Sequence, residues 1–189
     1  MEKNSIAKIV VIGGSAGSLE IILSMVPKLK NDLKFPLVLV LHRKVSSDDI
    51  LTDVIKLRTT LKVKEAEEKD ILSPATIYIC PSDYHLLFEK DKSISLDYSE
   101  KVNFSRPSID VTFQSAGDVF KENSVCILLS GGNNDGAKGL QFTKQHGGIT
   151  VVQDPSDAEV SYMPKEAIAI MEPDYILKSS ELPDFINSL

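Results

Sequence analysis

The chain has 189 residues, of which 42% are hydrophobic and 25% are charged, and its formal net charge at pH 7 is -6. This length suffices for one domain with an ordinary buried core, and the negative charge excludes a general attraction to nucleic acid or anionic lipid. The apolar segments are too short to cross a bilayer and the amino terminus lacks the apolar core of a signal peptide, so we expect a cytoplasmic protein without direct membrane insertion.

Short apolar runs alternate with helical patterns along the first third of the chain. In order, the sequence predicts a strand at Ile6–Ile12, a helix near Leu19–Leu29, a strand at Pro36–Leu41, a helix near Ser47–Thr59 and a strand at Lys62–Glu65. This alternation is typical of βαβ units, which build a mainly parallel sheet.

The middle of the chain has a different spacing. Three short runs, Ala75–Cys80, His85–Glu89 and Ser93–Asp97, lie close together and are separated by turn residues. Such spacing predicts antiparallel hairpins. The polar stretch Ser99–Asn103 that follows is the best candidate for a mobile loop.

The remainder returns to α/β alternation. The predicted elements are a helix near Ile109–Phe120, a strand at Ser124–Ser130, a glycine-rich loop at Gly131–Gly139, a helix up to Gln145, a strand at Gly148–Gln153 and helices near Pro164–Ile170 and Leu182–Leu189. The predicted fold class is therefore α/β: a doubly wound, mainly parallel, Rossmann-like sheet with an antiparallel β-hairpin insertion, in one domain over residues 1–189.

Three polar residues follow predicted strands, at the sheet edge where such folds bind ligands. Ser15 lies in a strand-to-helix turn that fits G-x-S-x-G, His42 directly follows a strand, and Asp135 lies in the glycine-rich loop. A nucleophile, a base and an orienting carboxylate at one edge predict nucleophilic catalysis. Taken singly, each residue has an ordinary alternative, namely a phosphate site, a surface-loop histidine or a helix cap.

The other candidates for chemistry have structural interpretations. His85 lies in a predicted hairpin and His146 at a helix end, so we expect both to be structural or solvent-facing. Cys80 and Cys126 lie in apolar runs without metal-ligand spacing, which predicts buried, reduced thiols. A dinucleotide fingerprint fails because Ser15 occupies a required glycine position.

Six blocks carry a resemblance to a known family. They read GGSAGSLE, LVLVLH, DILSPATIYICPSDYHLL, RPSIDVTF, LSGGNNDGAKG and QDPSDAEVSYMPKEAI, and they occur in this order between Lys8 and Ile170. Together they resemble the catalytic domain of the chemotaxis protein-glutamate methylesterases (CheB type). The resemblance covers the esterase domain alone, because the receiver domain that usually precedes it would need roughly another 120 residues. Regulation is therefore expected to come from elsewhere, for example from a separate regulatory protein.

The resemblance implies hydrolysis of methyl esters on chemoreceptor glutamates, and deamidation of receptor glutamines, by a triad of Ser15, His42 and Asp135 without a metal or cofactor. The expected partner is the cytoplasmic domain of a methylated chemoreceptor. Backbone N–H groups of Ala16 and Gly132 are the expected oxyanion donors. Arg106 either binds a substrate carboxylate or carbonyl, or forms a structural salt bridge with a loop acid.

Three departures from the family pattern leave alternatives open. The family typically reads S-T-G-G at the nucleophile, T-G-M-G-N-D-G in the third loop and Met-Pro after the histidine. At these places the chain has Ser15–Ser18 (SAGS), Ser130–Gly136 (SGGNNDG) and Arg43–Lys44. The alternatives are a receptor-binding domain of the same fold with weak or no turnover, and an esterase that acts on another substrate.

Overall fold

The computed structural model describes residues 8–43 and 48–189. Within them a seven-stranded sheet has the order β3-β4-β2-β1-β7-β8-β9, and all neighbouring strands are parallel. Its strands are β1 (Ile9–Gly14), β2 (Leu37–Leu41), β3 (Lys62–Glu65), β4 (Thr76–Ile79), β7 (Ser124–Leu128), β8 (Ile149–Gln153) and β9 (Tyr175–Leu177). The predicted mainly parallel α/β sheet is confirmed.

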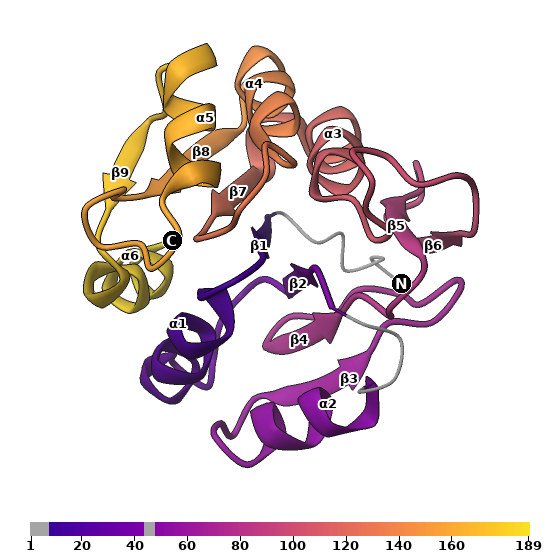
Figure 1. Ribbon diagram of the computed structural model, residues 1–189. Helices are drawn as coiled ribbons and strands as arrows, with labels where there is room; N and C mark the ends of the chain where they lie inside the picture. The colour runs from indigo at the N-terminus through magenta and orange to yellow at the C-terminus, as the bar shows by residue number, and fades with distance from the viewer. Residues whose placement is uncertain (1–7, 44–47) are drawn as a thin grey trace.

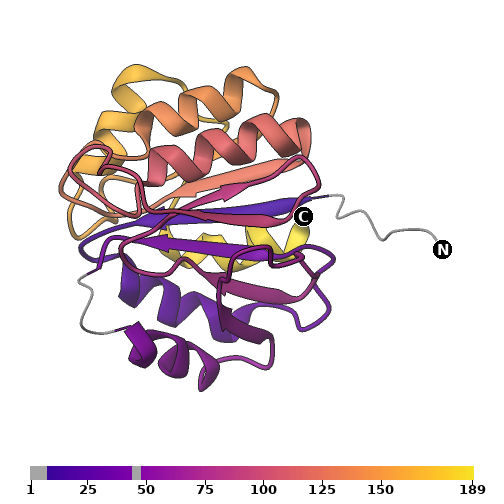
Figure 2. The ribbon, with the colours of Figure 1, turned by 90° about the vertical axis from the view of Figure 1, so that its right-hand side faces the viewer.

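Helices cover both faces of this sheet, as Figures 1 and 2 show. One layer contains α3 (Ile109–Phe120), α4 (Ala137–Gln145) and α5 (Tyr162–Ile170). The opposite layer contains α1 (Ser18–Met25), α2 (Asp48–Lys56) and α6 (Leu182–Ser188). Short 3-10 turns extend this set at η1 (Val26–Lys28), η3 (Lys121–Asn123) and η4 (Ser179–Glu181). None of the helices in the described part of the chain is long and apolar enough to span a membrane.

The central strand β1 is apolar throughout because both of its faces are covered. Ile9 and Val11 belong to the core beneath α3, α4 and α5, whereas Val10 and Ile12 belong to the core beneath α1, α2 and α6. Successive side chains of a strand point to opposite faces. A strand in the middle of a doubly covered parallel sheet therefore reads as a continuous apolar run.

The insertion is a two-stranded antiparallel sheet of β5 (His85–Phe88) and β6 (Ile94–Asp97), which confirms the predicted hairpin. It packs beneath α3, where the rings of Phe88 and Phe120 meet edge to face at 5.5 Å. The run Ala75–Cys80 was predicted as part of this hairpin region, and that prediction is wrong. The run forms β4 instead, which lies between β2 and β3 in the parallel sheet because both of its faces are buried.

Other predicted boundaries differ by a few residues. The first predicted strand begins at Ile6, outside the described residues, and β1 continues to Gly14. The helix predicted to end at Leu29 ends at Met25 and continues as the 3-10 turn η1, because Pro27 lacks the N–H that an α-helix needs. The start of the next helix was predicted at Ser47, which also lies outside the described residues.

The order of the strands places a crevice beside β1. From β1 the chain crosses through α1 to β2 on one face, whereas β7, its other neighbour, leads through α4 to β8 on the opposite face. Open α/β sheets bind ligands at such a switch point, beyond the carboxyl ends of the strands. Ser15, His42 and the loop 129–136 all follow strands at this point.

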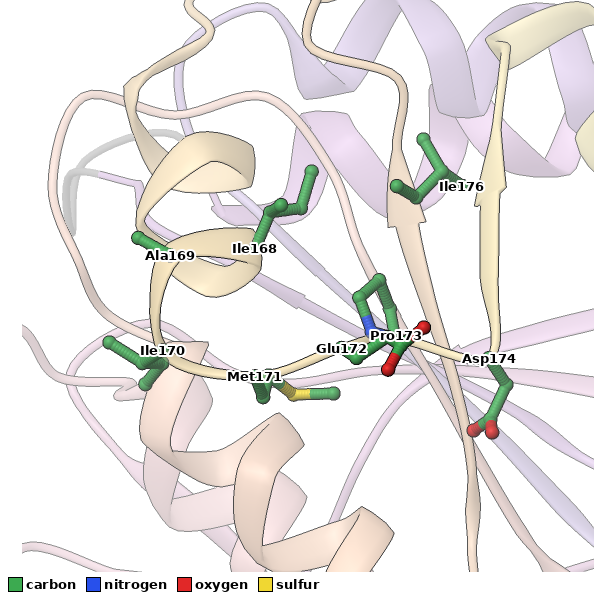
Figure 3. A pocket seen from close by; sticks show the side chains of 8 residues that line it. All are labelled: Ile168, Ala169, Ile170, Met171, Glu172, Pro173, Asp174 and Ile176. Atoms are coloured by element: carbon green, nitrogen blue, oxygen red, sulfur yellow. The ribbon is translucent and has the colours of Figure 1, made fainter.

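A larger hollow lies at the other end of the sheet. It has a volume of about 600 Å³ and lies between the end of α5 and the start of β9, where Figure 3 shows Ile168, Met171 and Ile176 around it. None of the eight residues labelled in Figure 3 is a Ser, Cys or His. The candidate nucleophile therefore belongs to a different cavity.

Candidate active site

Ser15 and His42 directly follow two neighbouring strands. Gly14 is the register partner of Leu41, and the N–H of His42 donates to the carbonyl oxygen of Gly14 at 3.2 Å. Since adjacent strands lie about 4.8 Å apart, this register brings the two residues to one place. Both line a cavity of about 220 Å³. No hydrogen bond joins their side chains within the described residues, so their pairing stays a prediction.

His42 and Asp135 are in direct contact. Nε2 of His42 lies 2.7 Å from Oδ2 of Asp135, and the two side chains are 13% and 0% exposed. An ionised carboxylate accepts hydrogen bonds and donates none, so Nε2 carries the proton in the neutral imidazole. Nδ1 is then the unprotonated nitrogen, available as a base.

The Asp135 carboxylate is held at the amino terminus of α3. Oδ2 also accepts the N–H of Ile109 at 2.6 Å, and Oδ1 accepts the N–H of Asp110 at 3.1 Å. The hydroxyl of Ser108 and the side-chain amide of Asn103 each donate to Oδ1 at 2.8 Å. The free N–H groups and the dipole of a helix amino terminus favour an anion there. These contacts fix the carboxylate that orients His42.

The charge of Asp135 is maintained despite its burial. Burial acts to raise the pKa of this carboxyl, but the hydrogen bonds from His42, Asn103 and the α3 backbone outweigh it, so the pKa lies below its ordinary value. Asp135 is therefore ionised at neutral pH. It can stabilise an imidazolium on His42 when that ring takes up a proton.

A second buried carboxylate, Asp110, mirrors this arrangement. Asp135 precedes α4 yet binds the first turn of α3, whereas Asp110 in the first turn of α3 accepts the N–H groups of Gly136 and Gly139 at 3.0 and 2.6 Å, at the start of α4. Burial and the neighbouring negative charge of Asp135 raise the pKa of Asp110. The two helices are therefore locked together through the acid beside His42.

Asn103 bridges the two carboxylates. Its amide nitrogen donates to Asp110 at 2.7 Å and to Asp135 at 2.8 Å. Its backbone φ is 52°, a left-handed conformation that asparagine tolerates better than most residues. The residue at the end of the predicted mobile loop thus separates two like charges and supports the site.

We expect Asn103→Gly to reduce stability more at pH 7 than at acidic pH. The substitution keeps the left-handed backbone but removes a donor to two carboxylates, which costs about 2 kcal/mol at pH 7. The lowered pKa of Asp135 means that its contribution is present above the unfolded value of about 3.9 and is lost as the pH falls through the folded pKa. In the variant, Asp110 lacks the Asn103 donor. The pKa of Asp110 is raised, so acidification protonates it and removes this uncompensated negative charge.

Urea unfolding of both proteins at pH 7, and at the lowest pH where the wild type still unfolds cooperatively, measures this difference. The conformational effect of the added glycine does not depend on pH, so a deficit that shrinks on acidification isolates the carboxylates. Equal deficits at the two pH values would show that Asn103 does not support the charged pair.

His85 also contacts the amino terminus of α3. Its Nδ1 accepts the N–H of Ser108 at 3.0 Å and its Nε2 lies 3.0 Å from the carbonyl oxygen of Glu100, with the ring buried. His146 lies at the end of α4, where it contacts the carbonyl oxygen of Phe142 and stacks on its ring. Both contacts agree with the predicted structural roles.

The predicted oxyanion donors lie on the β7 side of Ser15. The N–H of Ser15 donates to the carbonyl oxygen of Ser130 at 2.9 Å, and a Cβ placed on Gly131 would lie 3.1 Å from that of Ser15. Ala16 and Gly132, the next residue along each segment, are exposed, and within the described residues neither backbone N–H has a hydrogen-bond partner. Their role in binding an oxyanion stays a prediction.

Ser18, one of the departures from the family pattern, packs against the turn at Ser15. The Ser18 hydroxyl donates to the carbonyl oxygen of Ser15. A Cβ placed on Gly14 would lie 2.5 Å from the Cβ of Ser18. The extra side chain is buried and ties the first turn of α1 to the serine backbone. It therefore braces the turn, and Ser18 also lines the cavity of Ser15 and His42.

Arg106 is engaged by protein groups. Its Nε and Nη2 donate to Oδ1 of Asp83 at 3.0 and 2.7 Å, and Nη1 donates to the carbonyl oxygen of Ser99 at 2.6 Å. Its guanidinium also lies over the ring of Tyr98, 3.9 Å from the centroid. This geometry matches the salt-bridge interpretation, and a substrate contact by Arg106 stays a prediction.

The third departure from the family pattern, Arg43–Lys44, directly follows His42. Arg43 lines the cavity and its Nη2 donates to Glu65 at 3.3 Å and to the carbonyl oxygen of Cys80 at 3.1 Å, whereas Lys44 lies outside the described residues. Cys80 and Cys126 are free and buried, as predicted, and burial raises the pKa of both thiols.

The fold and the site define a doubly wound α/β protein with the polar groups of a serine hydrolase at its switch point. A family model described as CheB methylesterase matches residues 10–186. The crystal structure of the Thermotoga maritima CheB methylesterase catalytic domain has a TM-score of 0.91 and 32% identity, covering 96% of this chain and 97% of that one. The chain belongs to the CheB methylesterase family.

Two sequence relatives agree with this assignment. A protein of Leptospira interrogans is 41% identical over 175 residues, which make up 93% of this chain and 91% of the relative. The protein-glutamate methylesterase/protein-glutamine glutaminase of Thermotoga maritima is 32% identical over 180 residues, covering 94% of this chain and 52% of the relative. The chain therefore spans almost all of the first relative and about half of the second.

Proposed function

We propose that this protein is a serine hydrolase that removes methyl esters from glutamate side chains of chemoreceptors, and that Ser15, His42 and Asp135 are its catalytic triad. The observation that carries the proposal is the 2.7 Å contact between His42 and a fully buried Asp135, at the sheet edge where Ser15 directly follows β1. The name and fold of the Thermotoga relative support the reaction class.

Acylation begins with the unprotonated Nδ1 of His42. This nitrogen takes the Ser15 hydroxyl proton as Oγ attacks the ester carbonyl, and Asp135 stabilises the imidazolium through Nε2. The imidazolium then gives its proton to the departing methoxide, which is too basic to leave readily by itself. The ester C–O bond breaks, methanol leaves and the glutamyl group remains on Ser15.

Deacylation repeats the same proton transfers with water. His42 takes a proton from water as the oxygen attacks the acyl-serine, then returns that proton to Oγ of Ser15 as the acyl bond breaks. The product is a glutamate carboxylate on the receptor. The net reaction consumes one water and releases one methanol.

The free N–H groups of Ala16 and Gly132 are suited to the oxyanion of both tetrahedral intermediates. Backbone donors held by the Ser15 turn and the Ser130 loop need no reorganisation when negative charge develops, which is the usual source of a large rate gain. The space around Gly132 is open, since a Cβ placed there would meet only Val160 at 3.9 Å.

The substrate is expected to be the cytoplasmic domain of a methylated chemoreceptor. The same acyl-serine forms from a glutamine side chain, with ammonia as the leaving group in place of methanol, and the name of the Thermotoga relative includes this glutaminase activity. A single active site is therefore sufficient for both the ester and the amide substrate.

The test is to measure methanol from a methylated chemoreceptor cytoplasmic fragment, and ammonia from the same fragment carrying glutamine at the modified positions. We expect both products with the wild-type protein. Cleavage of simple esters without methanol from the receptor would favour an esterase with another substrate. Binding of the fragment without cleavage of any ester would favour the receptor-binding alternative, and either result would overturn the proposal.

A further inference from the structure

The cavity that Ser15 and His42 line is much larger than a methyl ester requires. Its volume is about 220 Å³, which corresponds to roughly seven water-sized units at about 30 Å³ each. The methyl group that leaves as methanol fills about one such unit. The remaining space lies directly beside the nucleophile and needs an occupant during turnover.

The wall of this cavity is mostly apolar and comes from elements on the face of α1 and α2, and Ser18 and Arg43 are its polar residues besides Ser15 and His42. Leu41 and Leu51 line it as buried side chains, and Leu19 and Ile50 line it at 43% and 66% exposure, near solvent. Val54 completes the α2 side. An apolar pocket with a few polar groups at one end fits a short hydrocarbon chain whose polar group faces Ser15 and His42.

The position of the cavity assigns it to one part of the substrate. The candidate oxyanion donors Ala16 and Gly132 lie towards β7, whereas the cavity opens towards β2 and α2. The alcohol leaves after the first step, but the acyl group stays bound to Ser15 through both steps. A largely apolar space beside Ser15 therefore benefits the acyl group throughout the reaction.

We propose that this cavity is an acyl-chain subsite, which gives the protein a further activity on esters of short unbranched carboxylic acids. From its volume, the subsite holds an acyl chain of about four to six carbons. The glutamyl group of a protein substrate places its two side-chain methylenes at the start of the same space. This inference rests on the proposed function, because it uses Ser15 as the nucleophile.

The test is hydrolysis of p-nitrophenyl esters from acetate to octanoate, in which the leaving group is constant and only the acyl chain changes. Each methylene that enters the cavity raises kcat/KM by about fourfold, so we expect a maximum near butanoate to hexanoate and a fall at octanoate. A matching series of butanoate esters with alcohols from methanol to hexanol is expected to show no such maximum. A flat acyl series, or a maximum in the alcohol series, would overturn the proposal.

Variants that fill the cavity sharpen this test. We expect Val54→Phe on α2 and Leu19→Phe on α1 each to lower the ratio of hexanoate to acetate kcat/KM at least tenfold. Leu57→Phe is the matched control. Leu57 directly follows the last residue of α2, but it is 86% exposed and does not line the cavity. Thermal melts identify a variant that fails to fold. Because Val54 and Leu19 lie on different helices, the two variants test the cavity independently.

The outcomes separate this proposal from the proposed function. Methanol release from the receptor that depends on Ser15, together with an acyl series that Val54→Phe does not change, would overturn the subsite alone. Hydrolysis that persists in Ser15→Ala would overturn both.

Discussion

Replacing Ser15 with alanine is expected to lower methanol release by about 10⁶-fold, the loss seen when a serine nucleophile is removed from a triad. The variant keeps the fold, because the Ser15 side chain makes no hydrogen bond within the described residues and its N–H, which binds Ser130, is unchanged. Removing Oγ leaves His42 with no nucleophile to activate. The measurement is kcat on a methylated chemoreceptor fragment.

Ser24→Ala is the matched control for this substitution. Ser24 is an exposed serine of α1 whose hydroxyl donates to the carbonyl oxygen of Ile21, and it lies outside the cavity. Its replacement is expected to change kcat by less than about twofold, because exposed positions seldom affect a distant site. Comparable turnover in Ser15→Ala and Ser24→Ala would show that Ser15 is not the nucleophile.

The second large effect is expected for Asp135→Asn, which should lower kcat by about 10⁴-fold. If the new amide N–H faces His42, it donates to Nε2 and forces the ring proton onto Nδ1, the nitrogen needed as the base. If it faces the other way, the new amide N–H takes the place of the oxygen that accepts from Ser108, Asn103 and Asp110, so donors face a donor. Either orientation also costs about 1–3 kcal/mol of stability, because a buried donor is left without an acceptor.

Turnover and urea unfolding of the same preparations separate the two effects. Asp118→Asn, on the exposed side of α3, is the control for replacing an aspartate by asparagine away from the site. We expect the catalytic loss to exceed by several orders of magnitude anything explained by the unfolded fraction. A variant that is destabilised but retains turnover per folded molecule would limit Asp135 to a structural role.

The sheet was predictable because its strands are buried on both faces. The continuous apolar runs around Val10, Leu39 and Ile127 predict parallel strands directly, and the residues that follow them predict the site edge. The edge strand β9 was not predicted, since Tyr175–Leu177 has only three residues and two of them are exposed. The parallel pairing of β4 was missed because close spacing in the sequence suggested a hairpin.

The groups around Asp135 show where sequence reasoning ends. Ser108 before the apolar run of α3 signals a helix start, but nothing local indicates that its hydroxyl contacts an acid 27 residues later in the chain. Asn103 and Asp110 likewise acquire their roles from the packing of α3 against α4. Sequence predicts the three residues that we propose as the triad, whereas the fold determines which neighbours hold the charge of Asp135.

We propose that Ser15, His42 and Asp135 act as one catalytic unit. Its most direct test is labelling of the protein with a fluorophosphonate, followed by peptide mapping by mass spectrometry, in the wild type and in His42→Ala. We expect one adduct, located on Ser15, whose rate of formation falls by several orders of magnitude without His42. An adduct on another residue, or labelling of Ser15 at the same rate in His42→Ala, would contradict it.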